Sequence, residues 1–553
     1  MSFTKTICII FLLLAGSLYV NAQSGGDYSW EHLPIVTTPV FKKDTFNIKN
    51  YGAKADGITL NTKNINKAID DCSAKGGGVV LIPKGLWLTG PLVLKSNVNL
   101  HVSRAALLQF TDDKSQYELV MGNFEGHPSP RNQSPISGTD LTNIAITGEG
   151  IIDGHGDVWR AIGKNRLTPD EWKEKVASGG IVSGDGNTWY PSESYLKGYK
   201  TPGSIVVLPG KSLNDYADMK DFFRPNMVVL TNCQKVLLED VTFQNSPAWC
   251  LHPLICQDLT VKGVHVRNNW NAQNGDGIDV ESCKNVLIEG STFDAGDDGI
   301  CIKSGRDAEG RRRDKPTENV IVRNNVVYRA HGGFVIGSEM SGGARNIFVS
   351  DCTFIGTEVG LRFKTTRGRG GIVEKIYIRN IAMKDIIGSA ILFDMYYGGK
   401  SAIDDQSKPS DVKKYTVDET TPQFRDFYVN NVVCNGADKG LLIRGLLEMN
   451  IKGIHLEDII LKTDKGAEIS EAQDISLKNV RFESRDTKPV VLIDNSSNIK
   501  LDSIACTNGA DLFFRISGER SQQISMLNTN ASGAKNKIEF KSGADSKSVT
   551  VSQ

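Results

Sequence analysis

The sequence predicts an all-β fold, a single-stranded right-handed parallel β-helix (a solenoid) with an N-terminal capping helix. An eight-residue phrase of alternating apolar and polar residues recurs from VLLEDVTF at residue 236 to IKLDSIAC at residue 499, which is the pattern of half-buried strands. Successive copies start 21 to 34 residues apart, with a single longer interval of 51, and such a period indicates a solenoid. The repeats carry no helical pattern, so a β-helix is favoured over a leucine-rich horseshoe.

A helix is predicted over residues 62–75, ahead of the regular coils. Its apolar residues share one face, namely Ile65, Ala68, Ile69 and Cys72. We expect Asn61 or Thr62 to cap its start and Gly76 to end it. Such a helix would cover the open end of the solenoid, where unpaired strand edges invite association.

The rest of the chain fits one domain behind an export signal. Residues 1–22 have the positive start, apolar stretch and small-residue cleavage site of a secretory signal peptide. Residues 23–45 are expected to form an N-terminal arm, and 46–553 a single β-helix domain with insertions near 160–224, 305–318 and 397–425. The sequence contains no other apolar run long enough for a membrane span, so we expect an exported protein, periplasmic or secreted, and a monomer.

Composition excludes several classes of protein. The chain has 64 Lys+Arg against 64 Asp+Glu and is 39% hydrophobic, so it is neither a disordered tail nor a binder of nucleic acid. Its cysteines form no CxxC pair or Cys/His cluster, and we expect no metal and no cofactor. Cys233, Cys256 and Cys283 open similar phrases and are predicted to fill equivalent interior positions, with one or two disulfides left open.

A second strand aligns charged residues from successive coils. The segments DGIDVES, DGICIKS, GGFVIGS and VGLRFKT begin at residues 276, 298, 332 and 359 and superpose without gaps. Their third and fifth residues are apolar and should face the core, so the fourth and sixth should face outward. This places Asp279 in one column with Arg362, and Lys303 in the next with Lys364. Asp276 and Asp298 share a turn position, and Asp297 shares a column with His331.

Such a patch suits the hydrolysis of an acidic polysaccharide. Two carboxyl groups about 6.5–9.5 Å apart leave room for the attacking water of an inverting glycosidase. Asp297 beside Asp298 supplies like-charge repulsion, which raises one pKa and keeps a protonated acid available. Arg362 and Lys364 are expected to bind a carboxylate of the substrate.

The motifs resemble those of glycoside hydrolase family 28, the polygalacturonases, most closely its bacterial exo-acting members. The resemblance rests on four motifs in order: Asn274-Gly275-Asp276, Gly296-Asp297-Asp298, His331-Gly332 and Arg362-Phe363-Lys364. It implies that Asp297 is the general acid, that Asp276 and Asp298 activate water with inversion, and that His331 supports the acid. It also implies hydrolysis of α-1,4-galacturonosidic linkages in pectin, with Arg362 and Lys364 binding galacturonate.

Other residues have both a structural and a functional interpretation. Asp279 either binds substrate or pairs with a cation, Lys303 is similar, and Tyr396 is a further candidate substrate contact with its neighbour Tyr397. Several cationic or aromatic residues fit solvent-exposed loops or buried packing as well as substrate binding, namely Arg311, Arg312, Arg313, Arg367, Arg369, Trp159, Trp249 and Trp270.

Three functional alternatives stay open at this point. A rhamnogalacturonan or xylogalacturonan substrate would use the same chemistry on a different pectic polymer. A polysaccharide lyase on the same fold would need clustered acids for calcium and a strongly basic group. A non-catalytic carbohydrate-binding β-helix would not need outward acids and bases to converge. We further expect that the long insertions close one end of the cleft and make the protein exo-acting.

Overall fold

The computed structural model describes residues 28–398, 413–507, 509–529 and 531–552. Met1–Leu33 and Pro34–Gln553 form two compact units, and of the first unit only residues 28–33 are described. The predicted signal peptide therefore lies outside the described residues, as does the middle of the insertion expected near 397–425. Among the described helices, none is long and apolar enough to cross a membrane.

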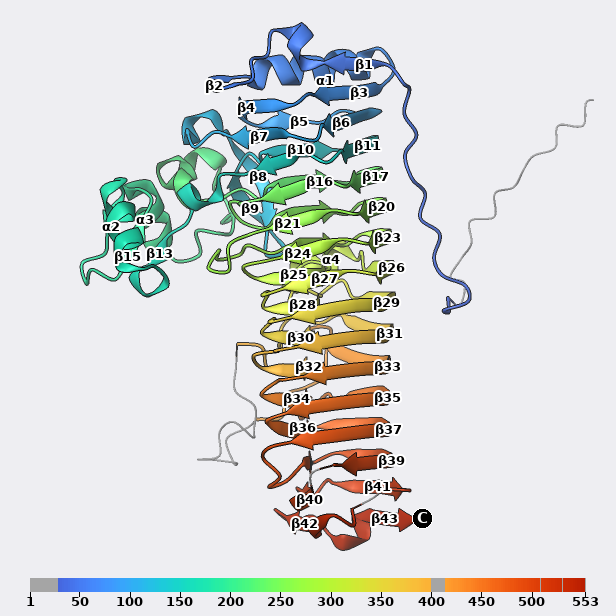
Figure 1. Cartoon of the computed structure of the whole chain (residues 1–553). Helices are drawn as coiled ribbons and strands as arrows, with labels where there is room; N and C mark the ends of the chain where they lie inside the picture. The colour runs from blue at the N-terminus through green and yellow to red at the C-terminus, as the bar shows by residue number, and fades with distance from the viewer. Residues whose placement is uncertain (1–27, 399–412, 508, 530, 553) are drawn as a thin grey trace, which may run out of the picture. The chain divides into compact units, whose positions relative to one another are not determined.

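The unit Pro34–Gln553 is a parallel β-helix whose coils stack along one axis (Figure 1). Within the described residues, both large sheets are parallel throughout. One of them, called the site sheet below, consists of β5(Leu92–Val93), β10(Ile136–Thr139), β16(Val228–Thr231), β19(Leu251–Leu254), β22(Ile278–Glu281), β25(Asp298–Lys303), β28(Gly332–Ile336), β30(Val359–Lys364), β32(Ser389–Asp394), β34(Lys439–Arg444), β36(Lys465–Ser470), β38(Val491–Asp494), β40(Ala510–Ser517) and β42(Ala534–Lys541).

The second large sheet contains two ladders that merge halfway along the solenoid. The first ladder consists of β1(Thr45–Asn47), β3(Gly78–Ile82), β6(Val98–Val102), β11(Thr142–Thr147), β17(Gln234–Glu239), β20(Gln257–Lys262), β23(Lys284–Glu289) and β26(Thr317–Arg323). The second consists of β2(Asp56–Leu60), β4(Gly85–Thr89), β7(Ala106–Phe110), β12(Ile151–Asp153), β18(Thr242–Gln244), β21(His265–Arg267), β24(Thr292–Asp294) and β27(Val326–Tyr328). Both pair with β29(Ala344–Ile355), and the ladder continues through β31(Ile372–Lys384), β33(Gln423–Asn435), β35(Ile451–Thr463), β37(Ala472–Ser484), β39(Ser497–Cys506), β41(Gln522–Leu527) and β43(Val549–Ser552).

The repeat phrase predicts the register of the first ladder correctly. Val236 pairs with Leu259, Leu259 with Val286, and Val286 with Val320. The same position continues through Ile347, Ile376, Phe427, Ile454, Ile475 and Ile499. The alternation works because successive side chains of a strand point to opposite faces, so one register places every apolar residue inside.

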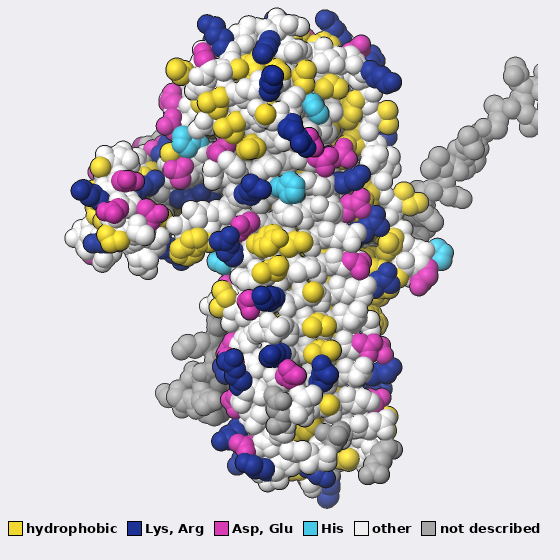
Figure 2. All heavy atoms as spheres, viewed as in Figure 1, with side chains coloured by type: hydrophobic (Ala, Val, Ile, Leu, Met, Phe, Trp, Pro, Cys, Tyr) yellow, Lys and Arg dark blue, Asp and Glu magenta, His cyan; other side chains and the backbone are white. Residues whose placement is uncertain are grey.

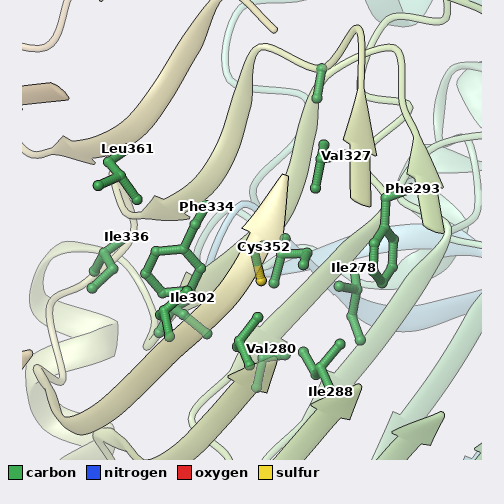
Figure 3. Close-up of a cluster of buried hydrophobic side chains, with 14 of the residues drawn as sticks. Ile278, Val280, Ile288, Phe293, Ile302, Val327, Phe334, Ile336, Cys352 and Leu361 are labelled. Carbon is green, nitrogen blue, oxygen red and sulfur yellow. The ribbon is translucent and has the colours of Figure 1, made fainter. Parts of the chain in front are cut away.

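The core is a continuous apolar column inside the coils. Figure 3 shows side chains of successive coils meeting there, among them Ile278, Val280, Ile302, Phe334 and Leu361, and each of these is fully buried. Burial of such a side chain contributes about 1.5–3 kcal/mol. Because the same strands carry charged residues on their other face, this packing fixes where those residues lie.

Stacked amide side chains connect consecutive strands near their starts. Asn285, Asn319 and Asn346 lie in β23, β26 and β29, and all have positive φ, a conformation that Asn tolerates better than most residues. Asn319 Nδ2 donates to Asn285 Oδ1, and Asn346 Nδ2 donates to Asn319 Oδ1. These hydrogen bonds run between consecutive coils and keep the strand starts in register.

The capping helix α1(Thr62–Ala74) is present as predicted, and its four apolar residues are fully buried. Asn61 occupies the N-cap position, but its side chain makes no capping hydrogen bond. It binds the Lys54 backbone instead, and Thr62 Oγ1 accepts from Gly90 N. The helix ends before Gly76, whose φ is +85°.

Segments outside the coils form a small appendage and a hairpin. Residues 160–224 contain β13(Ile162–Gly163), β14(Ile181–Val182), β15(Thr188–Tyr190), α2(Pro169–Ala177), α3(Glu193–Lys200), and the 3-10 helices η4(Lys164–Arg166) and η5(Leu213–Phe222), and they project from the side of the solenoid (Figure 1). The antiparallel hairpin of β8(Leu119–Phe124) and β9(His127–Asn132) lies beside the site sheet. The remaining short elements are α4(Asp307–Arg313), η1(Ile48–Tyr51), η2(Lys114–Gln116), η3(Gly156–Trp159) and η7(Ser546–Ser548).

The cysteines of the described chain are all free thiols. Cys233, Cys256 and Cys283 are buried on consecutive coils, and Cys256 N donates to Cys283 Sγ, so they fill equivalent interior positions as predicted. The solvent-exposed face in Figure 2 shows acidic and basic side chains interspersed, in keeping with a formal net charge of zero.

Candidate active site

The charged columns predicted from the sequence lie on four neighbouring strands of the site sheet. Ile278 pairs with Ile300, Ile300 with Phe334, and Phe334 with Leu361. Along the same register Asp279 and Arg362 share one column, with Cys301 and Val335 between them, and Lys303 aligns with Glu281. The gap-free alignment of these segments is therefore confirmed.

Three carboxylates meet at the start of these strands. One oxygen from each of Asp276, Asp297 and Asp298 lies within 4.8 Å of the others. Two glycines allow the coils to approach there, because a Cβ on Gly277 would lie 2.4 Å from the Gly299 carbonyl oxygen. These oxygens are closer together than the 6.5–9.5 Å expected above for an inverting enzyme. The expected wide gap is not what the structure shows.

Asp298 is held as a carboxylate by cations from a later coil. Lys364 Nζ lies 2.7 Å from Asp298 Oδ2, and Arg362 Nη1 lies 3.6 Å from Asp298 Oδ1. Burial alone would raise the pKa of Asp298, but Lys364, Arg362 and Lys303 together lower it to about 2. Repulsion between Asp297 and Asp298 therefore does not keep Asp298 protonated.

Asp276 has the opposite electrostatic environment. Its side chain is buried, and its Oδ1 has no hydrogen-bond partner. Burial, reinforced by the charges of Asp279 and Asp297, holds the pKa of Asp276 well above its ordinary value. The pKa of the fully buried Asp279 is raised for the same first reason. The carboxyl groups with a raised pKa thus lie on the Asp276 coil.

His331 and Asp297 form the more open side of the cluster. His331 Nδ1 lies 3.1 Å from Asp297 Oδ1, and their side chains are 48% and 22% exposed. The hydrogen bond to Asp297 raises the pKa of His331, against the opposing effect of burial. Arg362 Nη1 also donates to the His331 carbonyl at 2.9 Å, so the histidine is fixed from two neighbouring coils.

Lys303 and Asp279, which were candidate substrate contacts, are buried in the structure. Lys303 is 4% exposed and Asp279 is 0% exposed. Lys303 Nζ lies 2.8 Å from Glu339 Oε2, 3.6 Å from Asp279 Oδ1 and 4.9 Å from the centre of the Trp249 ring. Both residues are part of a buried ion network, which favours the cation-pairing interpretation over direct contact with substrate.

Tyr396 is not brought together with the other candidates. It is 5% exposed and packs with the solenoid core, under the guanidinium of Arg367. Its neighbour Tyr397 is 41% exposed and lies 5.0 Å from Lys364 Nζ and 6.0 Å from the Arg362 guanidinium carbon. The regular alternation ends with β32 at Asp394, so the phase of the strand no longer predicts which tyrosine faces outward.

Several basic loop residues make internal contacts. Arg311 donates to the carbonyls of Gly368 and Arg369. Arg369 Nη1 lies 2.6 Å from Asp307 Oδ1. Arg367 makes a bidentate ion pair with Glu448. Of the three tryptophans considered above, Trp159 and Trp249 are buried and Trp270 is 53% exposed.

Sequence reasoning missed a second buried network next to the site. Glu281 Oε2 lies 2.8 Å from His252 Nε2, and Glu281 Oε1 lies 2.6 Å from Arg313 Nη1. Burial would raise the pKa of Glu281, but His252 and Arg313 together lower it. Glu281 is the sixth residue of DGIDVES, so its column with Lys303 was a signal in the sequence. His252 and Arg313 gave no such signal.

The hairpin β8–β9 is the other missed component. Glu125 at its tip lies 2.9 Å from Arg306 Nη1, and Arg306 N donates to the Gly126 carbonyl. Its Phe124 packs against Trp249, with ring centres 5.5 Å apart. The hairpin thus connects the coil of β10 with the loop that follows β25, and it packs on Trp249.

A parallel β-helix with acids and cations converging on one sheet is an architecture of carbohydrate-active proteins, and comparison with known proteins gives the family. Residues 210–444 match the family model of glycosyl hydrolases family 28. Residues 45–102 match the model of rhamnogalacturonase A/epimerase, pectate lyase-like. The crystal structure of a hyperthermoactive exopolygalacturonase from Thermotoga maritima is 30% identical, with a TM-score of 0.63, over 84% of this chain and 93% of that one. The chain belongs to glycosyl hydrolases family 28.

Curated relatives agree with this assignment. An exo-poly-alpha-D-galacturonosidase of Dickeya chrysanthemi is 28% identical over 75% of this chain and 65% of its own length. A probable polygalacturonase of Vitis vinifera is 29% identical over 61% of this chain and 60% of its own length. The match thus spans somewhat less than two thirds of the length of these two relatives.

Proposed function

We propose that this protein hydrolyses the α-1,4-galacturonosidic linkages of pectin, with inversion and from a chain end. The observation that carries the proposal is the meeting of Asp276, Asp297 and Asp298 within 4.8 Å directly beside Lys364 and Arg362. Carboxylates are the groups that cleave a glycosidic bond, and the neighbouring cations suit a uronate. The named activities of the family relatives point the same way.

We assign a role to each carboxyl group from its protonation state and its exposure. Asp298 stays ionised next to Lys364, so it is the group that takes a proton from the attacking water. Asp276, with its raised pKa, positions that water by a hydrogen bond. Asp297, at the open side and hydrogen bonded to His331, donates a proton to the departing glycosidic oxygen. Arg362 and Lys364 bind the carboxylate of one sugar unit of the substrate, and Tyr397 lies against the ring of that sugar.

Exo action is supported by the segments around the N-terminal side of the site. The hairpin β8–β9 is anchored at Arg306 and lies over the coil of Trp249. The insertion at residues 160–224 brings the guanidinium carbon of Arg166 to 5.8 Å from the centre of the exposed Trp270 ring, which precedes the Asp276 turn. Walls on this side turn an open groove into a pocket that accepts a chain end. The hairpin adds to the insertions expected from the sequence.

Export to the periplasm or the exterior belongs to the proposal, because a pectic polymer is met outside the cell and residues 1–22 have the pattern of a signal peptide. The alternative of a rhamnogalacturonan or xylogalacturonan substrate is retained because the match at residues 45–102 is to a rhamnogalacturonase model. The lyase alternative has less support, because Asp298 already has Lys364 as its counter-charge.

A product-resolved assay tests this function. The protein is incubated with polygalacturonate, rhamnogalacturonan and xylogalacturonan, and products are followed by chromatography, reducing-end release and ultraviolet absorbance. We expect galacturonate monomer from polygalacturonate without an ultraviolet-absorbing product, and loss of turnover in Asp297→Asn. A ladder of oligomers would contradict exo action, an unsaturated product would favour a lyase, and unchanged turnover in Asp297→Asn would contradict the proposed chemistry.

A further inference from the structure

Six lysine and arginine side chains are buried among the described residues, and they fall into two groups. Lys303, Lys364 and Arg369 each pair with a carboxylate, namely Glu339, Asp298 and Asp307. The other three are Arg131, Arg160 and Arg224, which are 6%, 8% and 7% exposed and have no carboxylate within ion-pair distance in the described chain. Burying a charge without a counter-charge costs several kcal/mol, so these three require an explanation.

Two of the three are satisfied by backbone carbonyls. Arg224 Nη1 donates to the carbonyls of Pro247 and Gln273, and its Nη2 donates to Asn274 Oδ1 at 2.8 Å. Arg160 donates to the carbonyls of Ser246 and Gln273. Both arginines therefore fix the turn that leads into Asp276, two residues after Asn274. Two donor atoms of each guanidinium thus have acceptors.

Arg131 differs because no acceptor in the described structure meets its guanidinium. Its Nη2 is buried without a hydrogen-bond partner. The guanidinium carbon lies 4.0 Å from the centre of the Phe124 ring, and the side chain crosses Gly122, where a Cβ would lie 2.8 Å from Arg131 Cγ. A guanidinium has five N–H donors. This one is held in place by packing, and its Nη2 is left without an acceptor among the described residues.

The position of Arg131 places it at the site. It lies on the face of the hairpin that contacts Trp249, whose ring carries Lys303 Nζ at 4.9 Å. Trp249 lies two residues before β19, which is two strands before β25, whereas Arg362 lies on β30, two strands after β25. Neighbouring strands are about 4.8 Å apart. The hairpin that carries Arg131 therefore packs on the β19 side of the carboxylate cluster, and Arg362 lies on the β30 side.

We propose that Arg131 binds the carboxylate of the uronate unit on the β19 side of the cleaved bond, opposite the unit bound by Arg362 and Lys364. This inference rests on the proposed function and deepens it. Both sugars that flank the cleaved linkage must then be acidic, which selects homogalacturonan over a polymer in which a neutral sugar alternates with galacturonate. Burial, reinforced by the charge of Arg224, lowers the pKa of Arg131 to about 9, and a bound carboxylate would oppose both effects.

The test compares digalacturonate with its two analogues in which one or the other carboxyl group is reduced to the alcohol. We expect Arg131→Gln to lower kcat/KM for digalacturonate about 10- to 100-fold, the value of a hydrogen bond to a charged group. The same variant should leave unchanged the kcat/KM for the one analogue that lacks the contacted carboxylate. Arg131→Lys should keep part of the activity, and Arg104→Gln, at an exposed arginine of the N-terminal coils, is the matched control.

Three outcomes would overturn the inference. An equal loss for digalacturonate and both analogues would make Arg131 a structural residue, and no loss at all would exclude it from binding. If the wild-type protein cleaves both analogues with the same kcat/KM as digalacturonate, two acidic sugars are not required. This outcome does not depend on the stability of the variants. Calorimetric binding of digalacturonate to Asp297→Asn, with and without Arg131→Gln, measures the contact without turnover. If wild-type protein cleaves none of the three, the proposed function fails instead.

Discussion

Lys364 Nζ lies 2.7 Å from Asp298 Oδ2, although the two residues are 66 positions apart in the sequence. Both are buried, on strands separated by a single strand of the site sheet. This pair keeps Asp298 ionised in an environment that would otherwise protonate it. A lysine expected only to hold substrate therefore also sets the protonation state of the carboxylate that we propose as the base.

The first prediction concerns this pair. Lys364→Met removes the counter-charge, so the pKa of Asp298 should rise from about 2 and the acid limb of kcat/KM should move to higher pH. The sign follows because a depressed carboxyl pKa protects the ionised form until the pH falls through it. We expect kcat/KM to fall about 100-fold as well. Lys478→Met, at an exposed pair with Glu457, is the control, and an unmoved acid limb in Lys364→Met would contradict the argument.

The second prediction assigns the acid. Asp297→Asn cannot protonate the leaving oxygen, so turnover of digalacturonate should fall about 10²–10⁴-fold. An aryl galacturonide with a phenolate leaving group that needs no protonation should recover much of this loss. Asp298→Asn, which lacks the base, should be slow on both substrates. Comparable losses of Asp297→Asn on the two substrates would argue against its role as the acid.

The sequence predicted those parts of the molecule that obey the repeat. Asp279 and Arg362 share a column because strand alternation and coil stacking are both local rules, and a gap-free alignment captures them. Arg131, Phe124 and Trp249 were beyond this reasoning, since a hairpin that leaves the solenoid contacts coils far along the chain without any period. Tyr397 was not separated from Tyr396 because the alternation stops at Asp394.

The protonation states were also beyond the sequence. Two adjacent aspartates predict repulsion between Asp297 and Asp298, but not which buried cation lies closer to one of them. The balance between burial and Lys364 decides the pKa of Asp298, whereas burial and the charges of Asp279 and Asp297 raise that of Asp276. Both depend on distances of a few ångströms across coils.

The third prediction separates two adjacent arginines by stability. Arg313 pairs with the fully buried Glu281, whereas Arg312 is 78% exposed and pairs with Glu309. Arg313→Met leaves a buried carboxylate with one partner fewer, and we expect it to destabilise the protein by about 3–5 kcal/mol. Arg312→Met should have no resolvable effect. Thermal and denaturant unfolding of the two variants measure this, and equal midpoints would contradict a structural role for Arg313.

The fourth prediction concerns the alkaline limb of activity. The pKa of His331 is raised by Asp297 above its ordinary value of about 6.5. His331 therefore carries its positive charge below about pH 6.5 and loses it as the pH rises through the raised pKa. If His331 supports the acid, His331→Asn should lower kcat/KM about 100-fold and move the alkaline limb. His455→Asn, on β35 of the second large sheet and stacked against Tyr428, is the control. An alkaline limb that stays in place in His331→Asn would separate His331 from the acid.

The fifth prediction is the stereochemistry of the product. The spacing of the carboxylate oxygens favours retention, whereas the ion pairs and pKa values around them favour inversion. Oxygens within 4.8 Å are nearer than in most inverting enzymes, and a short gap is typical of a carboxylate that attacks the sugar directly. Asp298, however, is held by Lys364 and Arg362 at both oxygens, and Asp276 and Asp279 on the neighbouring coil are buried with raised pKa values. A carboxylate restrained in this way is better suited to orienting a water between Asp298 and Asp276 than to forming a covalent bond. Proton NMR of the first product should therefore show the β-anomer from an α-linked substrate, and the α-anomer would assign the attack to an aspartate.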